Sequence, residues 1–208
     1  AVPVHPRILA YATVSSTLAI RIAAESGIAE SNIAVVPNAV DLTRFGTVRV
    51  PPRVPRRAAL FGNQIARTPL VDLIATVTAR RGIELDFIGR SFGREVMDPE
   101  TTLPRYDIVF ASGKSAIDAM ACGCAVIVIG LQGCGEMVGT ANFDRLRAVN
   151  FTIPVNSASP VAAAIDAELG RYDADAVRAA TRRLRAEAGL DGLVDAFERL
   201  YREVIGRH

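Results

Sequence analysis

Residues 107–130 read D-I-V-F-A-S-G-K-S-A-I-D-A-M-A-C-G-C-A-V-I-V-I-G. Residues 108–111 and 125–129 are continuous apolar runs, which are typical of strands buried on both faces of a parallel sheet. Residues 113–122 between them predict a helix. A strand–helix–strand unit of this length implies a right-handed crossover, so this stretch predicts a parallel α/β sheet.

The same alternation continues on both sides of this unit. We expect further strands at 8–14, 33–36, 58–61 and 85–88, and helices at 17–25, 70–80, 162–169, 175–188 and 193–204. The fold class predicted is therefore α/β, a doubly wound parallel sheet with helices on both faces. Residues 39–56 hold several prolines and no clear period, so we expect a linker between residues 1–38 and a sheet domain at 57–208.

The composition is that of a globular protein. Of the 208 residues, 50% are hydrophobic and 22% charged, and the net charge of +2 is too small to indicate nucleic-acid binding. Lys114 is the only lysine among the 24 basic residues, an arginine bias typical of a GC-rich bacterial genome. No apolar run reaches the roughly 18 residues of a membrane span, and no secretory signal is recognisable. We expect a cytoplasmic protein, with peripheral attachment to the inner membrane face left open.

The three cysteines, Cys122, Cys124 and Cys134, do not form a known metal-binding pattern. The Cys-x-Cys pair lacks a second cysteine pair, and the two histidines, His5 and His208, lie near the chain ends. We therefore expect no metal site, and we interpret the cysteines as small apolar residues in a reducing compartment.

Ligands of an open parallel sheet bind beyond the carboxyl ends of its strands. Four predicted loops lie at that edge, and each contains glycine: Gly62-Asn63, residues 89–93, Ser112-Gly113 and residues 130–135. A single glycine often does no more than make a tight turn. Four glycine loops on one edge favour a binding site.

The N-terminus of the helix predicted after residue 112 is a candidate phosphate-binding site. Ser112 is a candidate N-cap whose oxygen would hold the amide of Lys114 or Ser115, and the free amides and helix dipole favour an anion. Asp118 follows Lys114 by one turn, about 5.4 Å, and its carboxylate could accept hydrogen bonds from a ribose diol. The alternative is an ordinary Lys114–Asp118 surface pair, and the spacing alone does not decide between them.

Several motifs resemble the group 1 glycosyltransferases, which have the GT-B fold. Residues 118–128, D-A-M-A-C-G-C-A-V-I-V, resemble their E-A-M-A-x-G-x-P-V-V segment. Residues 35–45, V-V-P-N-A-V-D-L-T-R-F, are similar to the I-P-N-G-V-D-x-x-x-F segment that joins the two Rossmann-like domains. Residues 14–16 resemble a V-S segment of the N-terminal domain, and residues 133–138, G-C-G-E-M-V, resemble the G-G-x-x-E loop.

The resemblance implies a Rossmann-like domain that binds a nucleoside-diphosphate sugar and transfers the sugar to a saccharide, lipid or small-molecule acceptor, without a cofactor or metal ion. Asp118 then stands at the place of the ribose-binding glutamate, and Arg67 falls near the phosphate-binding lysine after a one-residue shift. The predicted substrate-binding residues are Gly62, Asn63, Arg67, Gly89, Arg90, Ser112, Gly113, Lys114, Ser115, Asp118, Gly135 and Glu136.

The sequence departs from the family pattern in ways that bear on activity. Phe110 stands where the retaining enzymes carry a second glutamate, and Asn63 stands where an arginine is frequent. Residues 1–38 resemble only the last strand–helix–strand unit of an acceptor-side domain. Because transfer needs the acceptor hydroxyl held against the anomeric carbon, we expect the isolated chain to bind donor weakly and transfer little.

Two other functions remain as alternatives. The first is a non-catalytic nucleotide-binding or interaction domain derived from a glycosyltransferase. The second is an NAD-dependent dehydrogenase, which is disfavoured because no G-x-G-x-x-G follows the first strand. The final predicted helix carries an apolar stripe that would pack on residues 1–38 or, if exposed, promote a homodimer: Leu193, Val194, Phe197, Leu200 and Tyr201.

Overall fold

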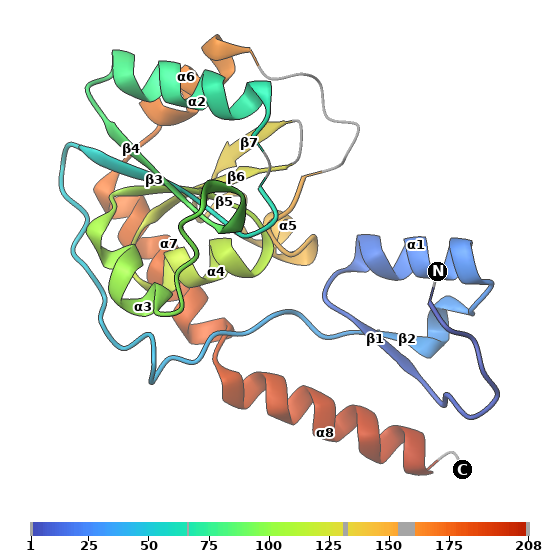
Figure 1. Cartoon of the computed structure of the whole chain (residues 1–208). Helices are drawn as coiled ribbons and strands as arrows, with labels where there is room; N and C mark the ends of the chain where they lie inside the picture. Colours follow the sequence, from blue (N-terminus) through green and yellow to red (C-terminus); the bar gives the residue numbers. More distant parts are fainter. Residues whose placement is uncertain (1, 66, 131–132, 154–160, 207–208) are drawn as a thin grey trace.

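The computed structural model describes residues 2–65, 67–130, 133–153 and 161–206. These residues form a small N-terminal unit and a larger unit built on a five-stranded sheet (Figure 1). An extended segment joins the two units, and the last helix runs back past the N-terminal unit (Figure 1).

The large unit contains a mixed sheet with strand order β4-β3-β5-β6-β7. Its strands are β3 (Arg57–Phe61), β4 (Glu84–Ile88), β5 (Ile108–Ala111), β6 (Ala125–Ile129) and β7 (Cys134–Met137). The first four are mutually parallel, which confirms the predicted α/β sheet, whereas β7 runs antiparallel to β6. The prediction of a loop over residues 130–135 is therefore wrong for Cys134 and Gly135, which belong to β7. The Cys-Gly-Glu-Met sequence has low strand propensity and becomes a strand by pairing with β6.

Helices cover both faces of this sheet, as predicted (Figure 1). One face is covered by α2 (Pro69–Arg80) and α6 (Ala162–Gly170), and the other by α4 (Gly113–Ala121) and α5 (Phe143–Ala148). The helix α7 (Ala174–Glu187) contributes to both cores, and the short α3 (Pro99–Thr102), η2 (Arg90–Phe92) and η3 (Leu103–Arg105) lie in connections. Along β5, Phe110 belongs to the α2 side and Val109 to the α4 side, as pleated strands require.

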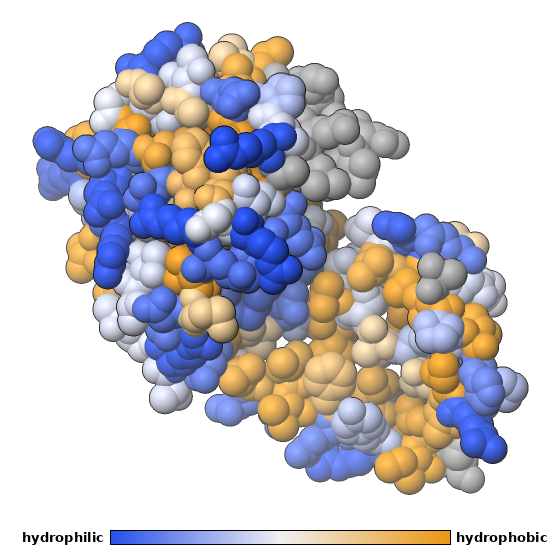
Figure 2. All heavy atoms as spheres, in the orientation of Figure 1, coloured by the Kyte–Doolittle hydropathy of each residue, from blue (hydrophilic) through white to orange (hydrophobic). Residues whose placement is uncertain are grey.

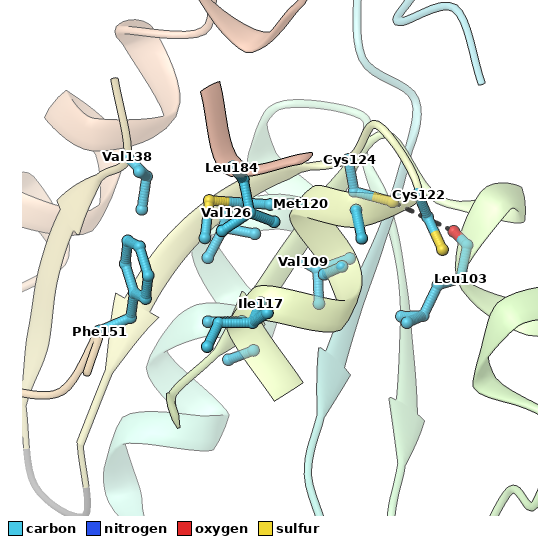
Figure 3. Close-up of a cluster of buried hydrophobic side chains, with 14 of the residues drawn as sticks. Leu103, Val109, Ile117, Met120, Cys122, Cys124, Val126, Val138, Phe151 and Leu184 are labelled. Carbon is cyan, nitrogen blue, oxygen red and sulfur yellow. Dashed lines mark hydrogen bonds between the residues drawn. The ribbon is translucent and has the colours of Figure 1, made fainter. Parts of the chain in front are cut away.

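Figure 3 shows the core between the sheet and α4. Val109 and Val126 of the sheet pack with Ile117 and Met120 of α4 and Leu184 of α7. The cluster is apolar and fully buried, and its burial holds α4 against β5 and β6.

Cys122 and Cys124 lie in this same core and act as small apolar side chains (Figure 3). The Cys124 thiol donates to the carbonyl of Leu103 at 3.2 Å. Burial raises the pKa of the Cys122 thiol to about 12, so this thiol stays protonated at neutral pH. Within the described ranges, no cluster of three or more His, Cys, Asp or Glu side chains is arranged to hold a metal ion.

The N-terminal unit is one strand–helix–strand repeat. It consists of β1 (Tyr11–Thr13), α1 (Ser16–Ser26), the short η1 (Glu30–Asn32) and β2 (Ile33–Val35), with β1 parallel to β2. The hydroxyl of Ser15 caps α1 by accepting from the Leu18 amide, and Gly27 ends it with a φ of 67°. The strand expected at 8–14 is shorter than predicted, because only Tyr11–Thr13 pair with β2 and a turn over residues 5–8 precedes them.

The segment between the two units packs along the large unit. The Val40 amide donates to the carbonyl of Ala188 at 2.8 Å, and Phe45 is buried in the core beside α4. The Arg185 guanidinium donates to the carbonyl of Phe45 at 2.7 Å. These contacts fix the path of the chain from the N-terminal unit to the sheet.

Asp107 joins this segment to the sheet at the edge opposite the glycine loops. One carboxylate oxygen accepts from the Arg49 guanidinium at 2.6 Å, and the other accepts from the amides of Arg56 and Arg57 at 2.7 and 2.8 Å. The Asp107 side chain is buried, so few of these bonds could be replaced by water.

The last helix, α8 (Leu190–Gly206), has no buried residue. Leu193 and Ala196 line a shallow cavity with Val36 and Pro37, while Val194, Tyr201 and Ile205 are exposed. Apolar groups gather on α8 and the N-terminal unit in Figure 2. No helix among the described residues has the length and hydropathy needed to cross a bilayer.

The Asp107 contacts yield a stability prediction. The substitution Asp107→Ala should lower the free energy of unfolding by about 3 kcal/mol, because it leaves the amides of Arg56 and Arg57 without their acceptor and removes the ion pair of the partly buried Arg49 guanidinium. Urea denaturation measures the change. The matched control is Asp175→Ala, which removes an exposed ion pair with Arg178 and should cost less than about 1 kcal/mol. Equal losses in the two variants would contradict this account of Asp107.

Candidate binding site at the carboxyl edge of the sheet

The loops after β3 and β4 meet at the carboxyl edge of the sheet. The Gly62 amide donates to the carbonyl of Ile88 at 3.0 Å. A Cβ atom at Gly89 would lie 2.3 Å from the Gly62 carbonyl oxygen, and Gly89 has φ 149° and ψ 168°, which side chains disfavour. The absence of a side chain at Gly89 therefore allows the two loops to pack backbone against backbone.

Side chains tie these two loops together. Asn63 accepts from the Arg90 amide at 3.2 Å and donates to the Glu95 carboxylate at 3.1 Å. Arg90 also pairs with Glu95 at 3.0 Å. The structure thus brings four of the predicted residues together: Gly62, Asn63, Gly89 and Arg90. Arg67 lies nearby in sequence, with its guanidinium 5.7 Å from the centre of the Phe92 ring.

The start of α4 adjoins these loops. Gly113 has a φ of 57°, and its amide donates to the carbonyl of Phe151 at 3.1 Å. A Cβ atom at Gly62 would lie 3.8 Å from the Ser115 hydroxyl, so Ser115 faces that loop.

Ser112 occupies the N-cap position of α4 but makes no side-chain cap bond. The prediction that its oxygen holds the amide of Lys114 or Ser115 is therefore wrong. Its side chain instead lines a cavity at the sheet edge, and residues 150–151 cover the helix start.

Lys114 and Asp118 form an ion pair along α4. Asp118 is 8% exposed, whereas the Lys114 side chain is 48% exposed and its ammonium lies 5.5 Å from the centre of the Phe45 ring. Burial raises the pKa of Asp118, and the hydrogen bond from Lys114 opposes that shift. The sequence spacing fitted either a ligand site or a Lys114–Asp118 ion pair, and the ion pair is formed in this structure.

Gly135 and Glu136 lie on β7 and have other partners. The Glu136 carboxylate accepts from Arg145 at 2.7 and 2.8 Å and from Asn142 at 2.8 Å. The hydrogen bond from Asn142 is the main cause that lowers the pKa of Glu136, and Arg145 adds to it. A Cβ atom at Gly135 would lie 2.8 Å from the Ile153 side chain. The contacts of both residues are thus with β6, the start of α5 and Ile153.

Two cavities meet at this edge of the sheet. The inner one, of about 210 Å³, lies at the ends of β3 and β6 and is lined in part by Gln64, Thr68, Ser112 and Thr152. The outer one, of about 640 Å³, lies between the two units and is lined by the first half of α1 and, across from it, by Val149, Asn150, Thr152 and Ile153. Gln64, Thr152 and Ile153 line both, so the two form one cleft, and a hollow between the units is visible in Figure 2.

Two residues that shape this cleft were not predicted from the sequence. Asn150 and Phe151 have φ angles of 54° and 49°, a backbone conformation that brings their segment over the start of α4. Asn150 also accepts from the Asn38 side chain at 3.1 Å and so contacts the connecting segment. Asparagine tolerates the left-handed region and gave a weak signal, whereas phenylalanine gave none.

Phe110 is fully buried and packs with Leu60 and Ile127 in the core on the α2 side. By the resemblance, this is the position of the second glutamate of the retaining enzymes. A core position cannot present a carboxylate to the cleft. The described part of β5 therefore supplies no acidic group at that place.

The fold as a whole matches a known enzyme. A glycosyltransferase from Rickettsia africae ESF-5 superimposes with a TM-score of 0.61 at 15% sequence identity, over 95% of this chain and 64% of that chain. The chain shares its glycosyltransferase fold. The match spans both units, and the arrangement is consistent with the GT-B fold that the motifs predict.

Two other solved glycosyltransferases are similar at lower scores. The glycotransferase of kitacinnamycin has 16% identity over 83% of this chain and 50% of that one, with a TM-score of 0.47. The spinosyn forosaminyltransferase has 13% identity over 81% of this chain and 50% of that one, with a TM-score of 0.44. No family model and no curated protein matches the sequence. The chain spans between half and about two thirds of the length of these glycosyltransferases.

The contact between Gly62 and Gly89 yields a second prediction. The substitution Gly89→Ala should lower the free energy of unfolding by at least about 2 kcal/mol, because the added methyl group overlaps the Gly62 carbonyl in a strained backbone. Thermal unfolding measures it, with Gly139→Ala as the control, because an added Cβ there meets nothing within 4 Å. A Gly89→Ala protein as stable as the control variant would show that the loops do not meet as described.

Proposed function

We propose that this chain is the donor-binding part of a glycosyltransferase and that it holds a nucleoside-diphosphate sugar at the carboxyl edge of its sheet. The observation that supports this most is the meeting of Gly62, Gly89 and the start of α4 beside a cleft, within a glycosyltransferase fold. Ligands of open α/β sheets bind at this edge.

The diphosphate would lie at the start of α4. The helix dipole and the first-turn amides of Lys114 and Ser115 favour an anion there, and the Ser115 hydroxyl faces the Gly62 loop. Because the Gly113 amide already donates to the Phe151 carbonyl, phosphate binding would depend on the amides of Lys114 and Ser115. Lys114 adds a full positive charge at the same helix end.

The ribose would lie one turn further along α4, at Asp118. Its carboxylate can accept hydrogen bonds from two neighbouring hydroxyl groups, each worth about 1.5–3 kcal/mol. In this structure the carboxylate holds Lys114 instead. Ribose binding therefore requires the ion pair to open.

The acceptor would enter the outer cavity between the two units. The one charged side chain among its described lining residues is Arg21, which pairs with Glu25 at 2.7 Å. The N-terminal unit contributes a single strand–helix–strand repeat to this side. We infer that the described residues hold an acceptor loosely and support little sugar transfer, since transfer needs a closely held acceptor.

A non-catalytic nucleotide-binding domain is the second candidate. The burial of Phe110 in the core favours it, because that strand presents no carboxylate to the cleft. Sugar hydrolysis or transfer separates the two candidates. The non-catalytic domain would bind nucleoside diphosphates without consuming a nucleotide sugar, even with simple sugar acceptors at high concentration.

Calorimetric titration with UDP, GDP and ADP tests the proposed site. The substitution Asp118→Asn should raise the Kd of the tightest-binding nucleoside diphosphate by about tenfold. The control Asp195→Asn on α8 should leave the Kd of the same ligand unchanged. Binding to the native chain should also weaken as the pH falls, because protonated Asp118, whose pKa is raised, no longer accepts two hydrogen bonds. No binding of any of the three at millimolar concentration would contradict the proposal.

The same variant separates a binding role from a structural one. A carboxyl group with a raised pKa stabilises the fold at low pH, and that contribution is lost as the pH rises. At neutral pH, Asp118→Asn should therefore leave the melting temperature unchanged or higher while binding weakens. A large drop in melting temperature would assign Asp118 to stability instead.

A further inference from the structure

We propose that Lys114 and Asp118 exchange partners when the donor binds. Lys114 moves from the Asp118 carboxylate to the diphosphate, and Asp118 then receives the ribose diol. The inference rests on the proposed function and adds to it a reason why the site would prefer a complete nucleoside diphosphate over either of its halves.

The ion pair closes the ribose position in the structure described here. The Lys114 ammonium contacts the Asp118 carboxylate and also lies over the Phe45 ring, 5.5 Å from its centre. Asp118 is 8% exposed, so little of its carboxylate is open to solvent. A diol can reach both oxygens only after Lys114 has left.

The pair is also easy to open. A lysine one turn before an acid is the less favourable order on a helix, because the cation stands near the positive end of the helix dipole. The Lys114 side chain is 48% exposed and flexible, so it can turn to a new partner without rearrangement of the core. A diphosphate at the start of α4 gives the ammonium more negative charge than one carboxylate does.

The two moves depend on each other. Pyrophosphate alone would draw Lys114 away and leave a nearly buried carboxylate unpaired, which is costly. A nucleoside alone would have to displace Lys114 without offering it a new partner. A nucleoside diphosphate does both at once, so the structure predicts positive coupling between the phosphate and ribose halves.

Removal of the lysine charge should therefore change the affinities for the nucleoside half and the phosphate half of the ligand in opposite directions. In Lys114→Gln, the affinity for a nucleoside should rise by roughly threefold, because Asp118 is no longer occupied. The affinity for inorganic pyrophosphate should fall by roughly tenfold, because the cation is lost. Lys114→Arg keeps the charge and should stay within about twofold of the native chain for both probes.

Calorimetric titration of the native chain and the variants with UDP, GDP and ADP, with uridine, guanosine and adenosine, and with inorganic pyrophosphate tests the exchange. The control is Arg178→Gln, which removes a helix-surface pair with Asp175 on α7 and should change none of these affinities. In the Asp118→Asn background, Lys114→Gln should no longer raise nucleoside affinity, because the competing pair is already absent.

The outcomes are distinct. Opposite changes for nucleoside and pyrophosphate support the exchange. If the native chain binds a nucleoside diphosphate but Lys114→Gln lowers the affinities for both nucleoside and pyrophosphate, or changes neither affinity, the exchange is overturned and the proposed function stands. If the native chain binds no nucleoside diphosphate, the proposed function fails and the inference fails with it.

Discussion

Burial of β5 and β6 on both faces is the constraint on which the rest of this structure depends. Every residue of the two strands is buried, so each face must be covered by helices. The helix α4 that connects them packs on one face, and α2 and α6 cover the other. This packing places the start of α4 at the carboxyl edge, beside the loops that contain Gly62 and Gly89.

The polar groups at that edge are arranged around this fixed helix start. Asn63 and Arg90 hold the two glycine loops together, and Lys114 and Asp118 neutralise each other along α4. The core sets the position of these groups, and the partly exposed Lys114 side chain is the group that we propose to move when the ligand binds. The proposed nucleoside diphosphate would use both parts of this arrangement, the fixed helix start for its diphosphate and the Asp118 carboxylate for its diol.

Sequence patterns identified the elements that the core dictates and missed those that depend on tertiary contacts. The continuous apolar runs of β5 and β6 predicted buried strands, and both were confirmed. The strand β7 was missed because Cys134 to Met137 pair with β6 despite low strand propensity. The cleft residue Thr152 carries no sequence signal, because its position follows from the backbone turn at residues 150–151. The Lys114–Asp118 spacing fitted a ligand site and an ion pair equally well, and only the packing around Asp118 showed the pair.

The central claim is that a nucleoside diphosphate binds at the carboxyl edge of the sheet. Backbone amide shifts in a ¹⁵N-labelled chain titrated with the tightest-binding nucleoside diphosphate test it most directly. The account predicts that the largest shifts occur at Gly62, Gly89, Ser115 and Asp118, while amides of α8 stay unchanged. Largest shifts on α8 or on β7, with these four amides unmoved, would contradict it.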